Sequence, residues 1–416
     1  MADESLKVVN FQSGSFITIE DKEDSGNFFI IRSGNVQLSR EMKVIEDTSQ
    51  PNRLNPGDFF GVISCMSNHN QLDTAVALTD VSLISIPRDH FGTLIQKNAP
   101  IAMKIIRQFS KQLRFYDSEI ARITLKNEIR DESTESLYNI GEYYFKQRKF
   151  NYATQIFKKY LKYCPNGKFL STATVRLQAM GVDVSGGGMN IDLPDNALTK
   201  SFPNDTMIFC EHEIGEELYI IQQGKVNITK ILQDKEILLA VLKESDIFGE
   251  MALLENKPRT ASAIAVGDVV VLRVNKANFE VMVVQKPQIA TRLIQLLSER
   301  IWIAFKQLEN LVIKTPLARV YDTLLTQIEK QRIPIEHKSS FTFELGPKEI
   351  INMLGFTPAE GENVINQVFQ NKKFVLVNGK IHCSDLEELK KQVDYFKKME
   401  EMERKREKSS TSSASS

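Results

Sequence analysis

The sequence predicts an α+β multidomain fold, in which two jelly-roll-like β-rolls are each followed by a long helix. Three observations predict it. Short strand-like runs, split by Gly and Pro, occupy residues 6–95 and again residues 201–282. Residues 99–128 and 287–312 then change to helical spacing. A C-terminal run of short helices ends in a two-residue hairpin signal, "NG", at residues 378–379.

Composition is that of a globular protein and argues against several classes of function. The 416 residues include 53 Lys+Arg and 53 Asp+Glu, so the chain lacks the strong basic footprint of a nucleic-acid or membrane-surface binder, although a local patch can exist. The four cysteines are far apart, so we expect no zinc site. We expect no signal peptide and no membrane span, because no apolar run approaches roughly 18–20 residues. The expectation is a cytoplasmic protein.

The two strand-rich regions are copies of one another. "NFFIIRSGNVQLS" aligns with "ELYIIQQGKVNIT", and "NPGDFFGVISCM" aligns with "KESDIFGEMALL". The period is too long for a solenoid, so it indicates a domain duplication. We expect the first domain at residues 1–128 and the second at residues 191–315. The long helix of the second domain has an apolar stripe close to that of a coiled coil, which predicts either a homodimer or an intrachain core helix: Ile289, Leu293, Leu297, Ile301, Leu308 and Leu311.

Residues 129–180 form a helical segment between the copies. Leu137, Gly141, Tyr144 and Phe157 fall at the spacing of one tetratricopeptide repeat. One such repeat cannot bury its own face, so we expect a tetratricopeptide-like helical hairpin that packs on a neighbouring domain. Residues 181–190 are rich in Gly and predict a flexible linker.

The C-terminal part of the chain predicts two further segments. Residues 316–385 have the pattern of helices followed by a short hairpin. Residues 386–416 predict a charged helix and then a disordered Ser-rich tail.

The most informative stretch is residues 247–263, "IFGEMALLENKPRTASA". A turn after Gly249 can align several backbone N–H groups, and such an arrangement binds anions. Arg259 offers a planar fork of donors that suits phosphate oxygens. Glu250 would repel a phosphate unless it accepts hydrogen bonds from a hydroxyl-bearing ligand. The pattern therefore predicts a pocket for a ribose phosphate.

This stretch resembles the phosphate-binding cassette of cyclic-nucleotide-binding domains, in which a β-roll holds cAMP or cGMP. The resemblance implies that Glu250 takes the ribose hydroxyl and Arg259 the cyclic phosphate. It also implies that the backbone completes the site at Gly249, Met251, Ala252, Thr260 and Ala261. A Thr after the arginine occurs in family members of both ligand preferences, so the expected regulatory ligand is cAMP or cGMP. We expect no catalytic cofactor.

The first copy departs from this pattern. In "GDFFGVISCMSNHNQLDTAVA", Val62 stands where the acid is expected, and Leu72 or Asp73 falls where the arginine is expected. An Asp that faces a phosphate opposes binding. We therefore expect residues 6–95 to form a degenerate β-roll that has lost the nucleotide chemistry.

Residues 201–383 as a whole resemble the Crp/Fnr family of bacterial regulators, which combine a β-roll, a long helix and a winged helix-turn-helix. The resemblance implies that the long helix pairs two subunits and faces the base of the ligand, where this chain offers Trp302 and Phe305 as candidates. It also implies that the second helix of the helix-turn-helix and the wing contact DNA. The candidates there are Asn363, Asn366, Gln367, Lys372, Lys373 and Lys380.

Charge argues against DNA binding by the C-terminal module, whereas the family resemblance argues for it. Residues 341–383 contain as many Glu as Lys, and phosphate contacts dominate DNA affinity. Two hypotheses therefore stay open. In the first, the chain is a cyclic-nucleotide-responsive transcriptional regulator. In the second, its winged helix has lost DNA binding and the sensor acts through protein contacts, with residues 134–180 as the candidate surface. No catalytic motif or metal-ligand spacing is present, so we do not expect an enzyme.

Overall fold

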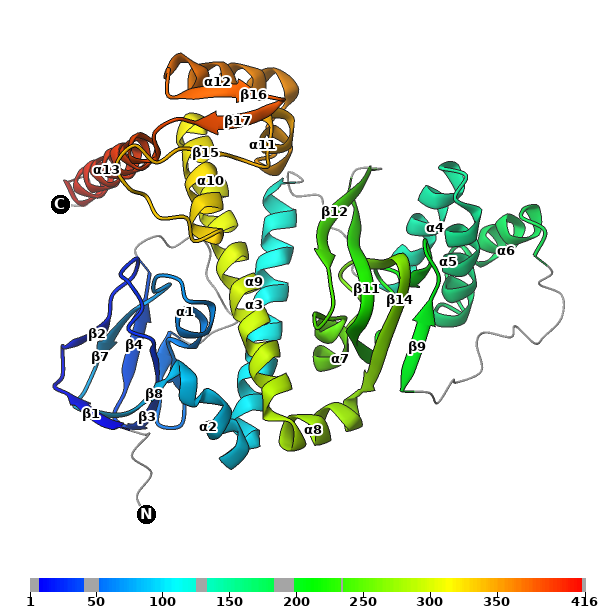
Figure 1. Ribbon diagram of the computed structural model, residues 1–416, viewed down its shortest axis with the longest axis horizontal. Coiled ribbons are helices and arrows are strands. Elements are labelled where there is room, and N and C mark those ends of the chain that lie inside the picture. Colours follow the sequence, from blue (N-terminus) through cyan, green and yellow to red (C-terminus); the bar gives the residue numbers. More distant parts are fainter. Residues whose placement is uncertain (1–6, 41–51, 125–132, 183–197, 233–234, 414–416) are drawn as a thin grey trace. The chain divides into compact units, whose positions relative to one another are not determined.

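The computed structural model describes five stretches of the chain (Figure 1), and the chain divides into two compact units. The first unit holds residues 1–88, 115–128 and 298–416, and the second holds residues 89–114 and 129–297. The described residues are 7–40, 52–124, 133–182, 198–232 and 235–413, so most of the predicted linker, residues 183–190, lies outside them.

The first unit contains the first β-roll, in which two four-stranded antiparallel sheets enclose an apolar core. One sheet has the strand order β1-β8-β3-β6 and the other β2-β7-β4-β5. Side chains from both sheets meet inside, among them Ile31, Val36, Ala75 and Leu83. The elements are β1 Lys7–Phe11, β2 Phe16–Thr18, β3 Asn27–Ser33, β4 Val36–Ser39, β5 Arg53–Leu54, β6 Phe59–Phe60, α1 Val62–Ser67, β7 Thr74–Ala77, β8 Val81–Pro87 and the 3-10 helix η1 Arg88–His90.

The second unit contains the second β-roll, which repeats this plan with longer strands. Its sheet runs β10-β14-β11-β12, with β13 paired to β11 and β9 paired to β14. The aligned registers agree, since Phe29 pairs with Phe60 in the first roll and Tyr219 pairs with Phe248 in the second. The predicted duplication is therefore present in the backbone pairing. The elements are β9 Thr199–Phe202, β10 Met207–Phe209, β11 Glu217–Leu232, β12 Lys235–Leu242, β13 Ile247–Phe248, α7 Glu250–Glu255 and β14 Ser262–Asn275.

The segment between the rolls is helical, but it has three helices where two were expected. They are α4 Leu137–Lys146, α5 Phe150–Tyr163 and α6 Leu170–Ala179, preceded by the 3-10 turn η2 Thr134–Ser136. As expected, the segment covers its apolar face on a neighbouring domain, because its core continues into the second roll at Met207, Cys210, Ile231 and Ile264. Polar contacts support this packing. The Tyr144 hydroxyl donates to Glu236 at 2.8 Å, and Lys159 pairs with Glu213 at 2.5 Å.

Two 26-residue helices, α3 Ala99–Thr124 and α9 Pro287–Val312, each pass through both units. They follow the shorter helices α2 Phe91–Lys97 and α8 Lys276–Gln285. In the first unit they lie side by side, where the Tyr116 and Phe305 ring centroids are 5.8 Å apart. Five of the six stripe residues of α9, all except Ile289, are buried within the single chain. The stripe therefore does not by itself support the expected homodimer.

Short helices and a three-stranded sheet, in the order β15-β17-β16, complete the first unit. Gly361 of α12 permits close packing on α11, because a Cβ there would meet Ile351 at 2.5 Å. The last helix continues to Ser413, deeper into the Ser-rich end than the expected disordered tail allows, and residues 414–416 lie outside the described residues. The elements are α10 Pro316–Lys330, β15 Phe341–Thr342, α11 Pro347–Met353, α12 Pro358–Gln370, β16 Phe374–Val377, β17 Lys380–Cys383 and α13 Leu386–Ser413.

None of the helices in the described stretches is both long enough and apolar enough to cross a membrane.

A half-buried carboxyl group in the first unit, that of Asp322, generates a prediction about pH. Burial raises the pKa of Asp322 on α10 to about 7, and the neighbouring Glu309 and Glu329 add to the rise while Lys397 and Lys306 oppose it. The unfolded chain releases this proton near the ordinary value of 3.8. Between these two values the folded state binds the proton more strongly.

We therefore expect the free energy of unfolding to fall as pH rises from about 4 to about 7. Asp322→Asn should reduce this slope in urea unfolding measured across that range. Asp394→Asn, on the exposed side of α13, is the matched control and should leave the slope unchanged. An Asp322→Asn protein with the wild-type slope would contradict the assignment.

Candidate functional site

The two repeats carry matching turns, which we name the first cassette (residues 59–75) and the second cassette (residues 247–263). In each, a short strand is followed by a glycine and a six-residue helix, α1 or α7. Gly61 and Gly249 both have a φ of 77°, in the left-handed region that favours glycine. The helices end at Asn68 and Asn256, which are also left-handed. Both pairs are 188 residues apart, so the two cassettes align without a gap over this stretch.

In the second cassette, Arg259 is buried and held by backbone carbonyl groups. It is 4% exposed. One terminal nitrogen donates to the carbonyl of Gly249, and the other donates to the carbonyl of Glu217 at 2.7 Å. The guanidinium carbon lies 4.2 Å from the centre of the Phe209 ring. Its Nε is buried and has no hydrogen-bond acceptor among the described residues. A desolvated cation with an unmet donor is a group that an anionic ligand would satisfy.

The other predicted residues surround Arg259 in sequence and lie in the same turn. Glu250 is the first residue of α7 and is 1% exposed. Met251 and Ala252 follow it in the first turn of the helix, and both are buried. Thr260 is half-buried and Ala261 is buried, directly after Arg259. Of the predicted residues, Gly249 contacts Arg259 directly, through its carbonyl group.

In the first cassette, the structure corrects the residue assigned to the arginine position. Arg259 exchanges backbone hydrogen bonds with a neighbouring loop, donating to Glu213 and accepting from His212, both at 2.8 Å. Gln71 makes the equivalent pair, donating to Lys22 and accepting from Asp21, both at 2.9 Å. Gln71 therefore stands where the arginine is expected. Leu72 and Asp73, which the sequence alignment suggested, are one and two positions too late.

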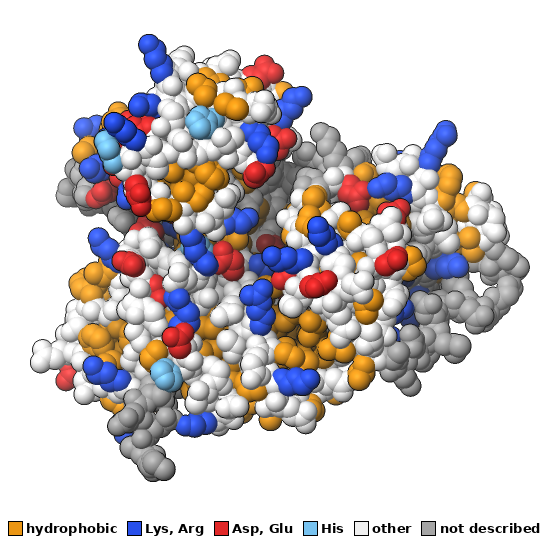
Figure 2. Space-filling view, viewed as in Figure 1, with side chains coloured by type: hydrophobic (Ala, Val, Ile, Leu, Met, Phe, Trp, Pro, Cys, Tyr) orange, Lys and Arg blue, Asp and Glu red, His pale blue; other side chains and the backbone are white. Residues whose placement is uncertain are grey.

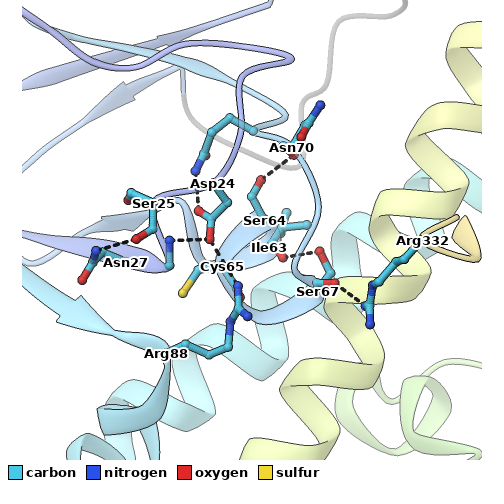
Figure 3. A network of polar contacts seen from close by, with 12 residues as sticks. Asp24, Ser25, Asn27, Ile63, Ser64, Cys65, Ser67, Asn70, Arg88 and Arg332 are labelled. Atoms are coloured by element: carbon cyan, nitrogen blue, oxygen red, sulfur yellow. Dashed lines mark hydrogen bonds and ion pairs between the residues drawn. The ribbon is translucent and has the colours of Figure 1, made fainter. Parts of the chain in front are cut away.

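Polar groups of the first cassette bond to neighbouring parts of the chain (Figure 3). The amide of Gln71 donates to Asp24 at 2.6 Å, and Arg88 bonds both Asp24 and the carbonyl of Cys65. The Asp24 side chain is 4% exposed. Val62, at the position of Glu250, is also buried. Gln71 replaces the arginine, and the buried carboxylate of Asp24 that it bonds would repel an anionic ligand.

The two base-side candidates lie with the first roll and not with the second cassette. Trp302 is 1% exposed and stacks on His69 with ring centroids 3.8 Å apart. Phe305 is 2% exposed, packs on Tyr116 and lies under the guanidinium of Arg40 at 4.3 Å. All of these residues belong to the first unit. Other side chains of the protein already pack against both rings, so the contacts of Trp302 and Phe305 do not support a role in base recognition.

The DNA-binding candidates lie at the surface of the first unit. Asn363 and Asn366 are exposed on α12, and Gln367 is half-buried. Lys372 is exposed in the turn before β16. Lys373 pairs with Asp385 at 3.2 Å, and Lys380 pairs with Glu344. Two of the three candidate lysines are thus in intrachain ion pairs, although exposed pairs of this kind are worth only about 0–1 kcal/mol.

Sequence reasoning missed several residues that shape the second cassette. Gly215 lies against Arg259, since a Cβ there would meet its guanidinium carbon at 2.6 Å. Glu217 supplies a carbonyl acceptor and Phe209 supplies the ring. No spacing rule connects these positions to Arg259, because strand pairing brings them together. Two residues of α3, Ser110 and Arg114, also contact the cassette, and only the fold reveals them.

Comparison with known proteins agrees with this geometry. Residues 8–98 and residues 199–286 each match the family model described as "Cyclic nucleotide-binding domain". The chain is 29% identical over 200 residues to the "CRP-like cAMP-activated global transcriptional regulator" of Mycobacterium tuberculosis, which covers 46% of this chain and 89% of that protein. It is 31% identical over 135 residues to the "Cyclic AMP receptor protein" of Thermus thermophilus, covering 32% and 62% respectively.

Among solved structures, the catabolite activator protein of Thermus thermophilus is 25% identical to this chain. That match covers 48% of this chain and 90% of the other, with a TM-score of 0.28. The family match and the relatives together make the chain similar to cyclic-nucleotide-binding regulators of the Crp/Fnr type.

The matched glycines at the two cassettes give a paired prediction. Gly61→Ala and Gly249→Ala should each lower the free energy of unfolding by about 1–2 kcal/mol, because alanine is strained at positive φ. Gly249→Ala should lose roughly 1–3 kcal/mol more, because its Cβ would come within 2.6 Å of an Arg259 nitrogen. The nearest atoms at Gly61 are 3.7 Å away. Equal losses in urea unfolding would contradict the crowding around Arg259.

Proposed function

We propose that the chain is a regulatory protein that binds a cyclic nucleotide, cAMP or cGMP, in its second β-roll. The observation that carries the proposal is the buried guanidinium of Arg259, whose Nε has no acceptor within the described part of the chain. A cyclic phosphate would supply that acceptor as a charge-assisted hydrogen bond. The "CRP-like cAMP-activated global transcriptional regulator" of Mycobacterium tuberculosis, among the relatives, supports cAMP as the first ligand to test.

Glu250 would bind the sugar in this proposal. A buried carboxylate near a phosphate is unfavourable unless donors compensate it, and ribose hydroxyl groups are such donors. Gly249, Met251, Ala252, Thr260 and Ala261 would present backbone groups to the ligand. Only one roll would bind, because Val62 and Gln71 replace the acid and the arginine in the first cassette.

The proposed output is regulation of transcription. The order α11, α12, β16, β17 is the order of a winged helix-turn-helix, with α12 as the helix that would enter the major groove. Its exposed Asn363 and Asn366 would read base edges, and Lys372, Lys373 and Lys380 would contact phosphates. Ligand binding would act by favouring one orientation of this module, which requires a different ligand affinity in the two states.

A second candidate output is contact with another protein. Figure 2 shows acidic and basic side chains interspersed over the face in view, so no large basic field is visible there. The wing strand β16 is apolar, with Val375, Leu376 and Val377 between 40% and 53% exposed. The helices α4–α6 are a further candidate surface through the sides that do not face the second roll.

Titration with nucleotide tests the proposed ligand. We expect cAMP or cGMP to bind with one site per chain in calorimetry. Arg259→Ala should weaken binding roughly 10- to 150-fold, since it removes a buried charge-assisted contact worth roughly 1.5–3 kcal/mol and leaves the phosphate unpaired. Arg176→Ala, in an ion pair with Glu142 away from the cassette, is the matched control and should bind as the wild type does. No heat with either nucleotide would refute the proposed function.

A salt series separates the two outputs. A DNA-binding chain should retain duplex DNA in a mobility-shift assay and lose affinity linearly with the logarithm of salt concentration. Lys372→Ala should reduce that slope by about one, because it removes one phosphate contact. Lys398→Ala, an exposed lysine of α13, should leave the slope unchanged. Failure to retain duplex at low salt, with and without nucleotide, would favour the protein-contact output.

A further inference from the structure

The long helix of the first repeat reaches the second cassette. Ser110 of α3 donates from its hydroxyl to a carboxylate oxygen of Glu255 at 2.8 Å. Arg114, one turn later, lies 3.1 Å from the other oxygen of Glu255 through its Nε. Both terminal nitrogens of Arg114 donate to the carbonyl of Pro258, at 3.3 and 3.4 Å. We name Ser110, Arg114, Glu255 and Pro258 the clasp.

The clasp is buried and lies entirely within the second unit. Ser110 is 0% exposed and Arg114 is 5% exposed, while the Glu255 side chain is 4% exposed. Two opposite charges are therefore desolvated together, and the exposed Lys257 is a second, more distant cation for Glu255 at 3.7 Å. The clasp therefore restricts the position of the loop at residues 255–258 relative to α3.

Within the clasp, the two residues of α3 contact the two ends of one short loop, at Glu255 and Pro258. Glu255 is the last residue of α7, the helix that begins with Glu250. Pro258 directly precedes Arg259. The clasp thus fixes the spacing between the helix that carries Glu250 and the residue that carries the guanidinium. A ligand that must contact both Glu250 and Arg259 depends on this spacing.

The first cassette has a contact at the equivalent place. Trp302 on α9 is 188 residues after Arg114, and His69 is 188 residues before Lys257 in the clasped loop. Trp302 stacks on His69, and Glu299 of α9 bonds the same imidazole at 3.0 Å. Arg332 donates to the carbonyl of Ser67 at the end of α1, at 2.6 Å (Figure 3). In each repeat, the long helix of the other repeat touches the loop that follows the cassette helix.

We propose that Ser110 and Arg114 of the first repeat are positioning residues for the nucleotide site of the second repeat. The nucleotide in this inference comes from the proposed function, whereas the contacts of the clasp are observed in the structure. The first repeat then has a role although its own cassette has lost the nucleotide chemistry. One chain supplies from its own α3 the contact that orders its site.

The test compares full-length variants by calorimetry with cAMP and with cGMP. Arg114→Ala and Glu255→Gln should each raise Kd roughly 10-fold at an unchanged number of sites, within the ~5–150-fold range of coupled sites. The double variant should be no weaker than either single one, because both remove the same interaction. Arg107→Ala, on the same helix in an exposed ion pair with Glu280, is the matched control. A Kd within twofold of wild type for Arg114→Ala would overturn the inference, whether or not the number of sites falls.

Hydrogen exchange of the ligand-free protein provides a readout that needs no nucleotide. Arg114→Ala should speed exchange of the amides of residues 250–260, while Arg107→Ala should not. Unchanged exchange in Arg114→Ala would also overturn the inference. If wild-type protein binds neither nucleotide, the proposed function fails, and exchange alone then decides whether the clasp positions the cassette.

Discussion

The buried guanidinium of Arg259 is the constraint on which the second roll depends. A cation removed from water is costly unless acceptors surround it. The structure meets this demand with the carbonyls of Gly249 and Glu217 and with the face of Phe209. These groups come from the turn before α7, from the start of β11 and from β10. The charge of one side chain is thus met by three separate segments that converge around the guanidinium.

The first roll shows what happens when this charge is absent. Gln71 takes the same backbone hydrogen bonds as Arg259, so the loop keeps its course. Its neutral amide donates a hydrogen bond to the carboxylate of Asp24, which would oppose a phosphate at that place. The cassette helix keeps its left-handed glycine and its buried position, since Gly61 and Gly249 share a φ of 77° and all residues of α1 are buried. Duplication therefore left two rolls of one shape with different chemistry.

The two repeats also exchange contacts through their long helices. Arg114 of α3 pairs with Glu255 in the second cassette, while Trp302 of α9 stacks on His69 in the first. The pairs are chemically unrelated, an ion pair in one case and an aromatic stack in the other, but they occupy equivalent positions. The same packing geometry therefore accommodates two chemically different contacts. It also explains why the apolar stripe of α9 is covered inside one chain.

The sequence by itself determined the duplication, the two strand-rich rolls, the long helix after each of them, and the stretch from Gly249 to Ala261 as the second cassette. These are local patterns, in which neighbouring positions are read directly from spacing. Tertiary structure decided the rest. Gln71, and not Leu72 or Asp73, fills the arginine position, because backbone pairing sets the register there. Trp302 and Phe305 belong to the first roll, and Arg114 contacts the second cassette. A helix places side chains on all its sides, and only packing decides which domain each side meets.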